Sequence, residues 1–117
     1  MKKCIFIILW LTMALEAGAQ SNISTADFLF QMEEYGSAAA IYDSILDTET
    51  EDSSQIYILG QIIECCSELE DYESCLEYDK RLLILAEEES LGHAGALWNL
   101  CIHNYLCGYY EKSAEYG

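Results

Sequence analysis

Metal-ligand side chains lie closest together in this sequence at Cys101, His103 and Cys107. His103 and Cys107 are four residues apart, so they would share one face of a helix. A structural zinc site takes four such ligands, but no fourth lies nearby in the sequence, and the helical register points Cys101 elsewhere. We therefore predict neither a metal ion nor a cofactor for this chain.

A cysteine and a histidine could also form a nucleophile and its base. That chemistry needs an orienting third group and an oxyanion site, and the sequence shows neither. It also contains no glycine-rich phosphate loop and no HExxH run. Nothing marks any pair among the 21 acidic residues as buried. We therefore expect a binding or structural role and predict that the chain is not an enzyme.

The charge of the chain limits its partners, because 21 acidic residues against five lysines and arginines give a formal net charge of −16. Such a surface repels the phosphates of nucleic acids, so we exclude nucleic acid as a partner. A basic partner fits this charge, and so does a role in solubility. Most acids fall in short clusters at expected helix ends, which favours a solvated surface over a cation site.

The first 19 residues have the pattern of a secretory signal peptide. Lys2 and Lys3 precede an apolar run at 5–15, and an Ala-x-Ala pattern follows at 17–19. The run is too short to span a membrane, which takes about 20 apolar residues, although an uncleaved anchor or a chance apolar helix would look similar. We predict export to the periplasm or another extracytoplasmic space of a bacterium, and a mature domain at 20–117.

The rest of the chain is expected to be helical, because it has no proline and its apolar residues recur every three or four positions. Ser53 or Ser54 can cap one of these helices, and Asp71 another. Short and longer connections alternate, as in antiparallel helix hairpins that follow one another. The spacing predicts helices at about 24–34, 37–47, 54–69, 73–88, 93–107 and from 110 to the end.

One short template recurs three times along these helices. Tyr35, Tyr72 and Tyr110 stand 37 and 38 residues apart, and each is followed three places later by alanine, cysteine or serine. A period of this length is typical of helical repeat arrays, in which each unit buries its apolar face only against its neighbours. The period predicts an all-α chain and favours a binding scaffold.

Residues 96–117 resemble a tetratricopeptide repeat, the two-helix module of roughly 34 residues. The positions that carry this resemblance are Leu97, Leu100, Cys101, Gly108, Tyr110 and Ser113. The middle unit matches less well, because Ile63 stands at the family's small position and Asp79 at the aromatic position of the second helix. The resemblance implies stacked antiparallel helix hairpins over 20–117, in a right-handed α-solenoid of about two and a half repeats with the last one incomplete.

This register also assigns places to the cysteines. Cys75 and Cys101 fall in small buried positions and Cys66 on the inner face of its helix, where cysteine behaves as a small apolar residue. We expect these three to be buried, unpaired thiols, with a Cys66–Cys75 disulfide as the alternative. Cys65 and Cys107 are expected to be exposed.

In a stack of this kind the first helices of the hairpins line a concave face. The register places six side chains there, namely Tyr57, Glu64 and Glu68 from the second unit and Trp98, Ile102 and Tyr105 from the third. An aromatic and acidic lining suits an extended peptide with apolar and basic side chains. The alternative is that the same residues pack against a further unit or bind nothing.

Together these observations predict an exported scaffold that binds a protein or a peptide. Exported bacterial sensors resemble this combination of leader and repeats. We therefore expect the chain to be the extracytoplasmic sensing part of a larger signalling protein, and to be a fragment whose last repeat is unfinished. Membrane contact would then come only through a segment downstream of residue 117. The alternative is a structural or oligomerisation module without a ligand groove.

Overall fold

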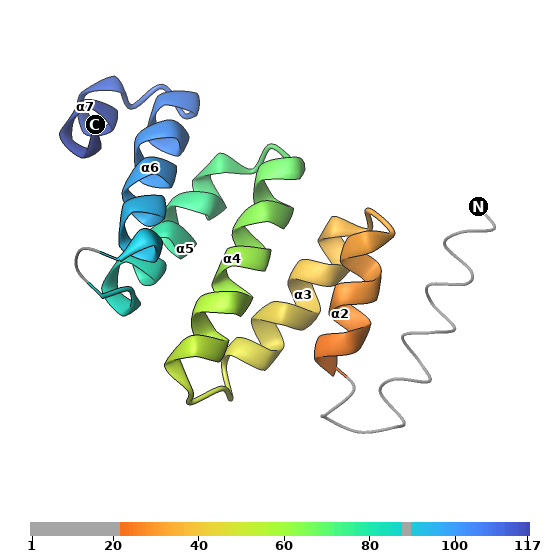
Figure 1. The fold of residues 1–117 in the computed structure, drawn as a ribbon. Coiled ribbons are helices and arrows are strands. Elements are labelled where there is room, and N and C mark those ends of the chain that lie inside the picture. Colours follow the sequence, from red (N-terminus) through yellow and green to blue (C-terminus); the bar gives the residue numbers. More distant parts are fainter. Residues whose placement is uncertain (1–21, 88–89) are drawn as a thin grey trace.

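The computed structural model describes residues 22–87 and 90–117 (Figure 1), and every regular element in these two stretches is an α-helix. The helices are α2 (Asn22–Gln31), α3 (Tyr35–Leu46), α4 (Asp52–Glu68), α5 (Tyr72–Leu85), α6 (Leu91–Leu106) and α7 (Tyr110–Tyr116). The prediction of an all-α chain is therefore confirmed for the described residues. The predicted leader at 1–19 lies outside them.

Local caps explain where some of these helices begin. Asp71 caps α5 as predicted, because its carboxylate accepts a hydrogen bond from the backbone N–H three residues on, at 3.3 Å. α6 begins two residues earlier than expected, because the Ser90 hydroxyl accepts the equivalent bond at 3.1 Å. The prediction for α4 is wrong, since Ser53 and Ser54 lie inside this helix and do not cap it.

Each described helix packs against the helix that follows it in the sequence, from α2 on α3 through to α6 on α7. Short turns join α2 to α3, α4 to α5 and α6 to α7, and longer loops connect the resulting hairpins. In Figure 1, α2, α4 and α6 lie in front of α3 and α5. A closed bundle would also bring α2 against the later helices, and no extensive contact of that kind joins the described helices.

The three short turns share one backbone conformation, repeated at the period of the tyrosines. The residue at the bend has a positive φ each time, of 62° at Glu33, 59° at Glu70 and 86° at Gly108. The N–H of the next residue then reaches back to the carbonyl five residues earlier, with N–O distances of 2.9, 2.8 and 2.8 Å. These features define the Schellman motif, which ends a helix and satisfies its last carbonyls. The backbone conformation of the turns thus repeats with the same period as the side-chain types.

The second helix of every hairpin, α3, α5 or α7, begins at one of the three repeated tyrosines. The small residue three positions later is buried in each hairpin, as the template predicted. It faces the first helix of its own hairpin: the Ser113 hydroxyl donates to the Cys101 carbonyl at 2.8 Å, and Cys75 Sγ lies 3.7 Å from the Ile63 carbonyl oxygen. Small side chains at this point let the two helices approach closely.

The cysteines show how completely α4 is enclosed between α3 and α5. Cys66 and Cys75 are buried thiols, as predicted, and the five described cysteines are all free. The prediction that Cys65 is exposed is wrong, because Cys65 is fully buried. Adjacent residues on a helix point about 100° apart, so Cys65 and Cys66 point in different directions. Both can be buried because α4 has one neighbouring helix in α3 and another in α5. Cys101 and Cys107, expected to be buried and exposed respectively, are both half-buried.

Candidate partner-binding face

The six side chains predicted to line a binding surface project from two of the front helices. Residues three, four or seven positions apart return to one side of a helix, so the three from α4 share a side, and so do the three from α6. All are exposed except Ile102, which is half-buried. We call this set the first-helix face; it consists of Tyr57, Glu64, Glu68, Trp98, Ile102 and Tyr105.

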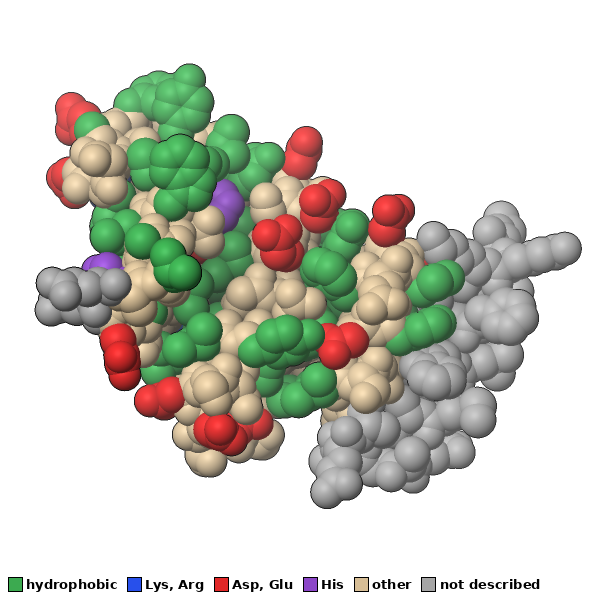
Figure 2. Space-filling model, in the orientation of Figure 1, with side chains coloured by type: hydrophobic (Ala, Val, Ile, Leu, Met, Phe, Trp, Pro, Cys, Tyr) green, Lys and Arg blue, Asp and Glu red, His purple; other side chains and the backbone are tan. Residues whose placement is uncertain are grey.

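Figure 2 views the molecule from the side on which α2, α4 and α6 lie in front. Hydrophobic side chains and carboxylates are interspersed over this side, and no lysine or arginine is visible on it. The described residues contain three such bases, Lys80, Arg81 and Lys112, and none belongs to α2, α4 or α6. The first-helix face is therefore both apolar and negatively charged.

At the α2 edge of this face, a carboxylate that the sequence analysis did not single out connects α2 to its neighbouring helices. Asp27 Oδ1 accepts hydrogen bonds from the hydroxyls of Tyr57, at 2.9 Å, and of the buried Tyr42. Gln61 donates to the Tyr42 hydroxyl at 3.3 Å. Burial, followed by the hydrogen bond to Asp27, raises the pKa of Tyr57. Asp27 stands one repeat period before Glu64. The repeat would therefore have pointed to Asp27 as the residue of the first hairpin that is equivalent to Glu64.

Tyr57 therefore has two roles that the sequence did not separate. Its hydroxyl is engaged with Asp27 and ties α4 to α2. Tyr57 as a whole is 48% exposed, so the ring is the part of this side chain that a partner can contact.

Glu64 and Glu68 supply the negative charge of the face. Neither carboxylate forms an ion pair within the described residues. Tyr35, from the turn of the preceding hairpin, lies beside them; burial and then the charge of Glu68 raise the pKa of its hydroxyl. A cationic side chain of a partner would meet these two carboxylates in exposed positions.

The α6 part of the face is apolar. Trp98 is 65% exposed and Tyr105 is 60% exposed, and Ile102 lies between them on the same side of the helix. Leu91, which the sequence analysis did not single out, extends this line seven residues earlier and is also exposed. Tyr105 packs edge-on against Tyr110, with ring centroids 5.2 Å apart. Contiguous exposed apolar side chains of this kind mark interaction sites.

The cysteine and histidine cluster found in the sequence does not converge on one site. His103 turns into the protein, where its Nδ1 lies 2.5 Å from Asp79 Oδ2. Cys107 follows the last turn of α6 and is half-buried. The described stretches contain no group of three histidine, cysteine or acidic side chains arranged to hold a metal ion.

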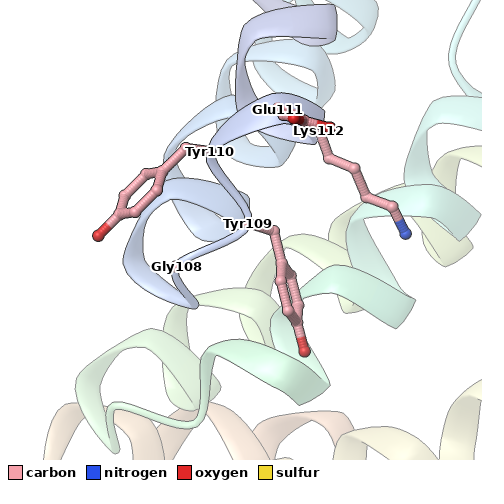
Figure 3. A pocket seen from close by; sticks show the side chains of 5 residues that line it. All are labelled: Gly108, Tyr109, Tyr110, Glu111 and Lys112. Carbon is pink, nitrogen blue, oxygen red and sulfur yellow. The ribbon is translucent and has the colours of Figure 1, made fainter.

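The third turn holds a small open cavity (Figure 3), lined by Gly108, Tyr109, Tyr110, Glu111 and Lys112. In Figure 3 the side chains of Tyr109 and Tyr110 point to different sides of the turn. The Tyr109 hydroxyl donates to Glu73 Oε1 of α5 at 2.7 Å. Tyr109 is thus tied to α5 and Tyr110 lies against Tyr105, and we assign no ligand to this cavity.

Comparison with protein-family models, with curated proteins and with solved structures finds no match for this chain. Function must therefore be inferred from the first-helix face and from the repeated hairpins. Among the helices of residues 22–87 and 90–117, none is both long enough and apolar enough to cross a membrane.

Proposed function

We propose that this chain is an exported scaffold of stacked, tetratricopeptide-like hairpins that binds a protein or peptide through the first-helix face. The observation that carries the proposal is the composition of that face, with exposed apolar side chains on α6, carboxylates without an ion pair on α4, and no lysine or arginine on either helix. The predicted leader and the family resemblance support a role as the extracytoplasmic sensing part of a larger signalling protein.

The repeated turn supports the stacking of hairpins. Schellman turns, tyrosines at the start of the second helices and buried small residues all recur at 37 and 38 residues. The first two turn tyrosines also interact with the following hairpin. The charge of Glu68 on α4 acts on the Tyr35 hydroxyl, and Tyr72 stacks on His103 of α6 with a centroid distance of 6.0 Å. A solenoid is built from nearest-neighbour contacts of this kind.

The proposed partner is an extended segment with basic and bulky apolar side chains. Buried aromatic residues dominate the binding energy of many interfaces, and Trp98 and Tyr105 offer their rings to solvent. Glu64 and Glu68, in a chain of net charge −16, attract basic groups over roughly 8 Å at physiological ionic strength. Binding should therefore weaken as the salt concentration rises.

A peptide of alternating lysine and leucine tests this proposal, with a glutamate–leucine peptide of the same length as the matched control. The sequence contains two tryptophans, so a Trp10→Phe variant leaves Trp98 as the single tryptophan. We expect the lysine peptide to shift the Trp98 emission, and to bind less tightly with added salt, while the glutamate peptide has no effect. Equal responses to both peptides, or a response to neither, would refute the proposal.

A structural or oligomerisation module is the second candidate, and one observation favours it. Tyr35 and Tyr72 are half-buried, whereas the equivalent Tyr110 is 63% exposed and offers its ring to another chain. Sedimentation velocity over a range of protein concentrations distinguishes the two candidates. A mass that rises with concentration would support the module, and a strict monomer would exclude it.

A further inference from the structure

Asp79 is a completely buried carboxyl group at the junction of the second and third hairpins, with 0% of its surface exposed. It stands 37 residues after Tyr42, so the second hairpin places a carboxyl where the first buries a phenol ring. Asp79 Oδ2 lies 2.5 Å from Nδ1 of His103, and His103 is itself only 5% exposed. The ring of Tyr72 stacks on that imidazole. The pair is thus sealed between α5 and α6.

Few groups compensate the charge of this carboxyl. Those that face it are His103 and Asn99 from α6, and the thiols of Cys66 from α4 and of Cys75 from α5 itself. Among them only His103 can carry a positive charge. Asn99 lies nearby, but Oδ1 of Asp79 has no hydrogen-bond partner. The buried pair is therefore neutral overall while it holds one titratable proton, and anionic once that proton is lost.

We propose that Asp79 and His103 form a pH-sensitive clamp, which holds α6 on α5 while the pair keeps its proton and loosens when rising pH removes it. An uncompensated charge in a buried site is far less favourable than a neutral pair of groups. Movement of α6 away from α5 would admit water to the carboxylate and relieve that cost. With the proton in place, the same atoms form a short hydrogen bond in an apolar surrounding, and the junction stays closed.

The direction of the effect follows from the carboxyl group. Burial raises the pKa of Asp79, and the hydrogen bond and charge of His103, followed by the amide of Asn99, oppose this shift only in part. A group whose pKa is raised by folding contributes stability that is fully present below its ordinary pKa and is lost as pH rises through the raised value. The clamp therefore tightens toward acid pH and loosens toward alkaline pH. Tyr42, in the equivalent place of the first hairpin, stays neutral over that range.

Loosening of the clamp would separate the two halves of the first-helix face. α6 carries the apolar half, including Trp98, whereas α4 carries Glu64 and Glu68. A partner that bridges both helices would bind less tightly as pH rises. This consequence rests on the proposed function, but the clamp itself does not.

Hydrogen–deuterium exchange of the full chain, from about pH 5 to pH 9, tests the clamp. After correction for the intrinsic exchange rates, protection of α6 and α7 should fall by up to about tenfold per pH unit, the limit set by one proton. Protection of α2 and α3 should stay constant. Asp79→Asn keeps the shape of the side chain but cannot titrate, so it should remove this slope. Asp47→Asn, at an exposed position, is the matched control and should keep it.

The carboxyl carbon chemical shift of Asp79 gives a second readout on the unchanged chain, which applies even where Asp79→Asn does not fold. Because burial raises the pKa of Asp79, we expect this carboxyl to lose its proton over the pH range in which α6 loses protection. Three results would each overturn the clamp. They are a wild-type slope in Asp79→Asn, a parallel loss of protection in α2 and α3, and protection of α6 that does not change while the Asp79 carboxyl loses its proton.

Discussion

Tyr78 of α5 donates a hydrogen bond from its hydroxyl to Asp43 Oδ1 of α3 at 3.0 Å, across 35 residues of sequence. This bond ties the second helices of two successive hairpins together. Two further bonds of the same kind join Tyr57 to Asp27 and Tyr109 to Glu73. In this acidic chain, tyrosine hydroxyls satisfy carboxylates that have few basic partners, and each of these three bonds connects one hairpin with its neighbour.

Tyr78→Phe should lower the free energy of unfolding by about 1 kcal/mol, because it removes this hydrogen bond and leaves the half-buried Asp43 without its donor. The ring would keep its contact with Arg81, whose guanidinium lies 5.7 Å from the ring centroid. Urea denaturation measures the change. Tyr105→Phe is the control, since the Tyr105 hydroxyl makes no hydrogen bond within the described residues. Equal losses in the two variants would contradict this role of Tyr78.

Glu70→Gly should raise the free energy of unfolding by up to about 1 kcal/mol, because Glu70 has a φ of 59° and this left-handed conformation is unfavourable for residues other than glycine. The third hairpin already has Gly108 at this position, so Gly108→Ala should destabilise by a similar amount. Thermal denaturation checks both. Glu77→Gly, inside α5, is the control and should destabilise by about 1 kcal/mol. A Glu70→Gly variant as unstable as Glu77→Gly would disprove the strain in this turn.

Ile63→Ala should lower the free energy of unfolding by about 2–5 kcal/mol, although it introduces the small residue expected at this position in tetratricopeptide repeats. Ile63 of α4 is almost completely buried in the hydrophobic core, so truncating its side chain leaves a cavity. Ile84→Ala is the control, because Ile84 is 83% exposed and should change stability by less than about 0.5 kcal/mol. Urea midpoints that are alike in the two variants would show that the hairpin closes around the smaller side chain.

The chain should lose stability progressively above pH 9. Burial raises the pKa of Cys65 from its ordinary value of 9.0 to about 12, so its contribution is fully present below 9.0 and is lost as pH rises through about 12. Burial likewise raises the pKa of Tyr78 to about 12, which acts in the same direction. Unfolding free energies measured over this range should fall less steeply in Cys65→Ala. Thiolate absorbance that develops near pH 9 from Cys65 in the folded chain would contradict the prediction.

The turns and the small buried positions could be predicted from the sequence because they depend on local chemistry. Tyr35, Tyr72 and Tyr110 begin their helices as the template indicated, and the residues of the first-helix face other than Ile102 are exposed. To predict these features, only the helical period and the residue types of a single turn are needed. The leader, the export and the partner stay predictions.

Contacts between hairpins could not be predicted in the same way, because they depend on how each hairpin is rotated against the next. Asp79 stood out in the sequence only as a mismatch to an aromatic position, yet it is the partner of His103, 24 residues away. Cys65 was expected on the surface, yet it is fully buried in a helix that packs against α3 of the preceding hairpin as well as against α5.

Binding of the lysine–leucine peptide to three alanine variants, measured by calorimetry, is the most direct test of the first-helix face. Trp98→Ala and Tyr105→Ala should each weaken binding at least about tenfold, or roughly 1.4 kcal/mol, with an unchanged urea midpoint. Ile84→Ala removes an exposed apolar side chain from α5 and should bind as the wild type does. Equal affinity in all three variants, or unfolding of Trp98→Ala and Tyr105→Ala, would contradict the assignment of this face to a partner.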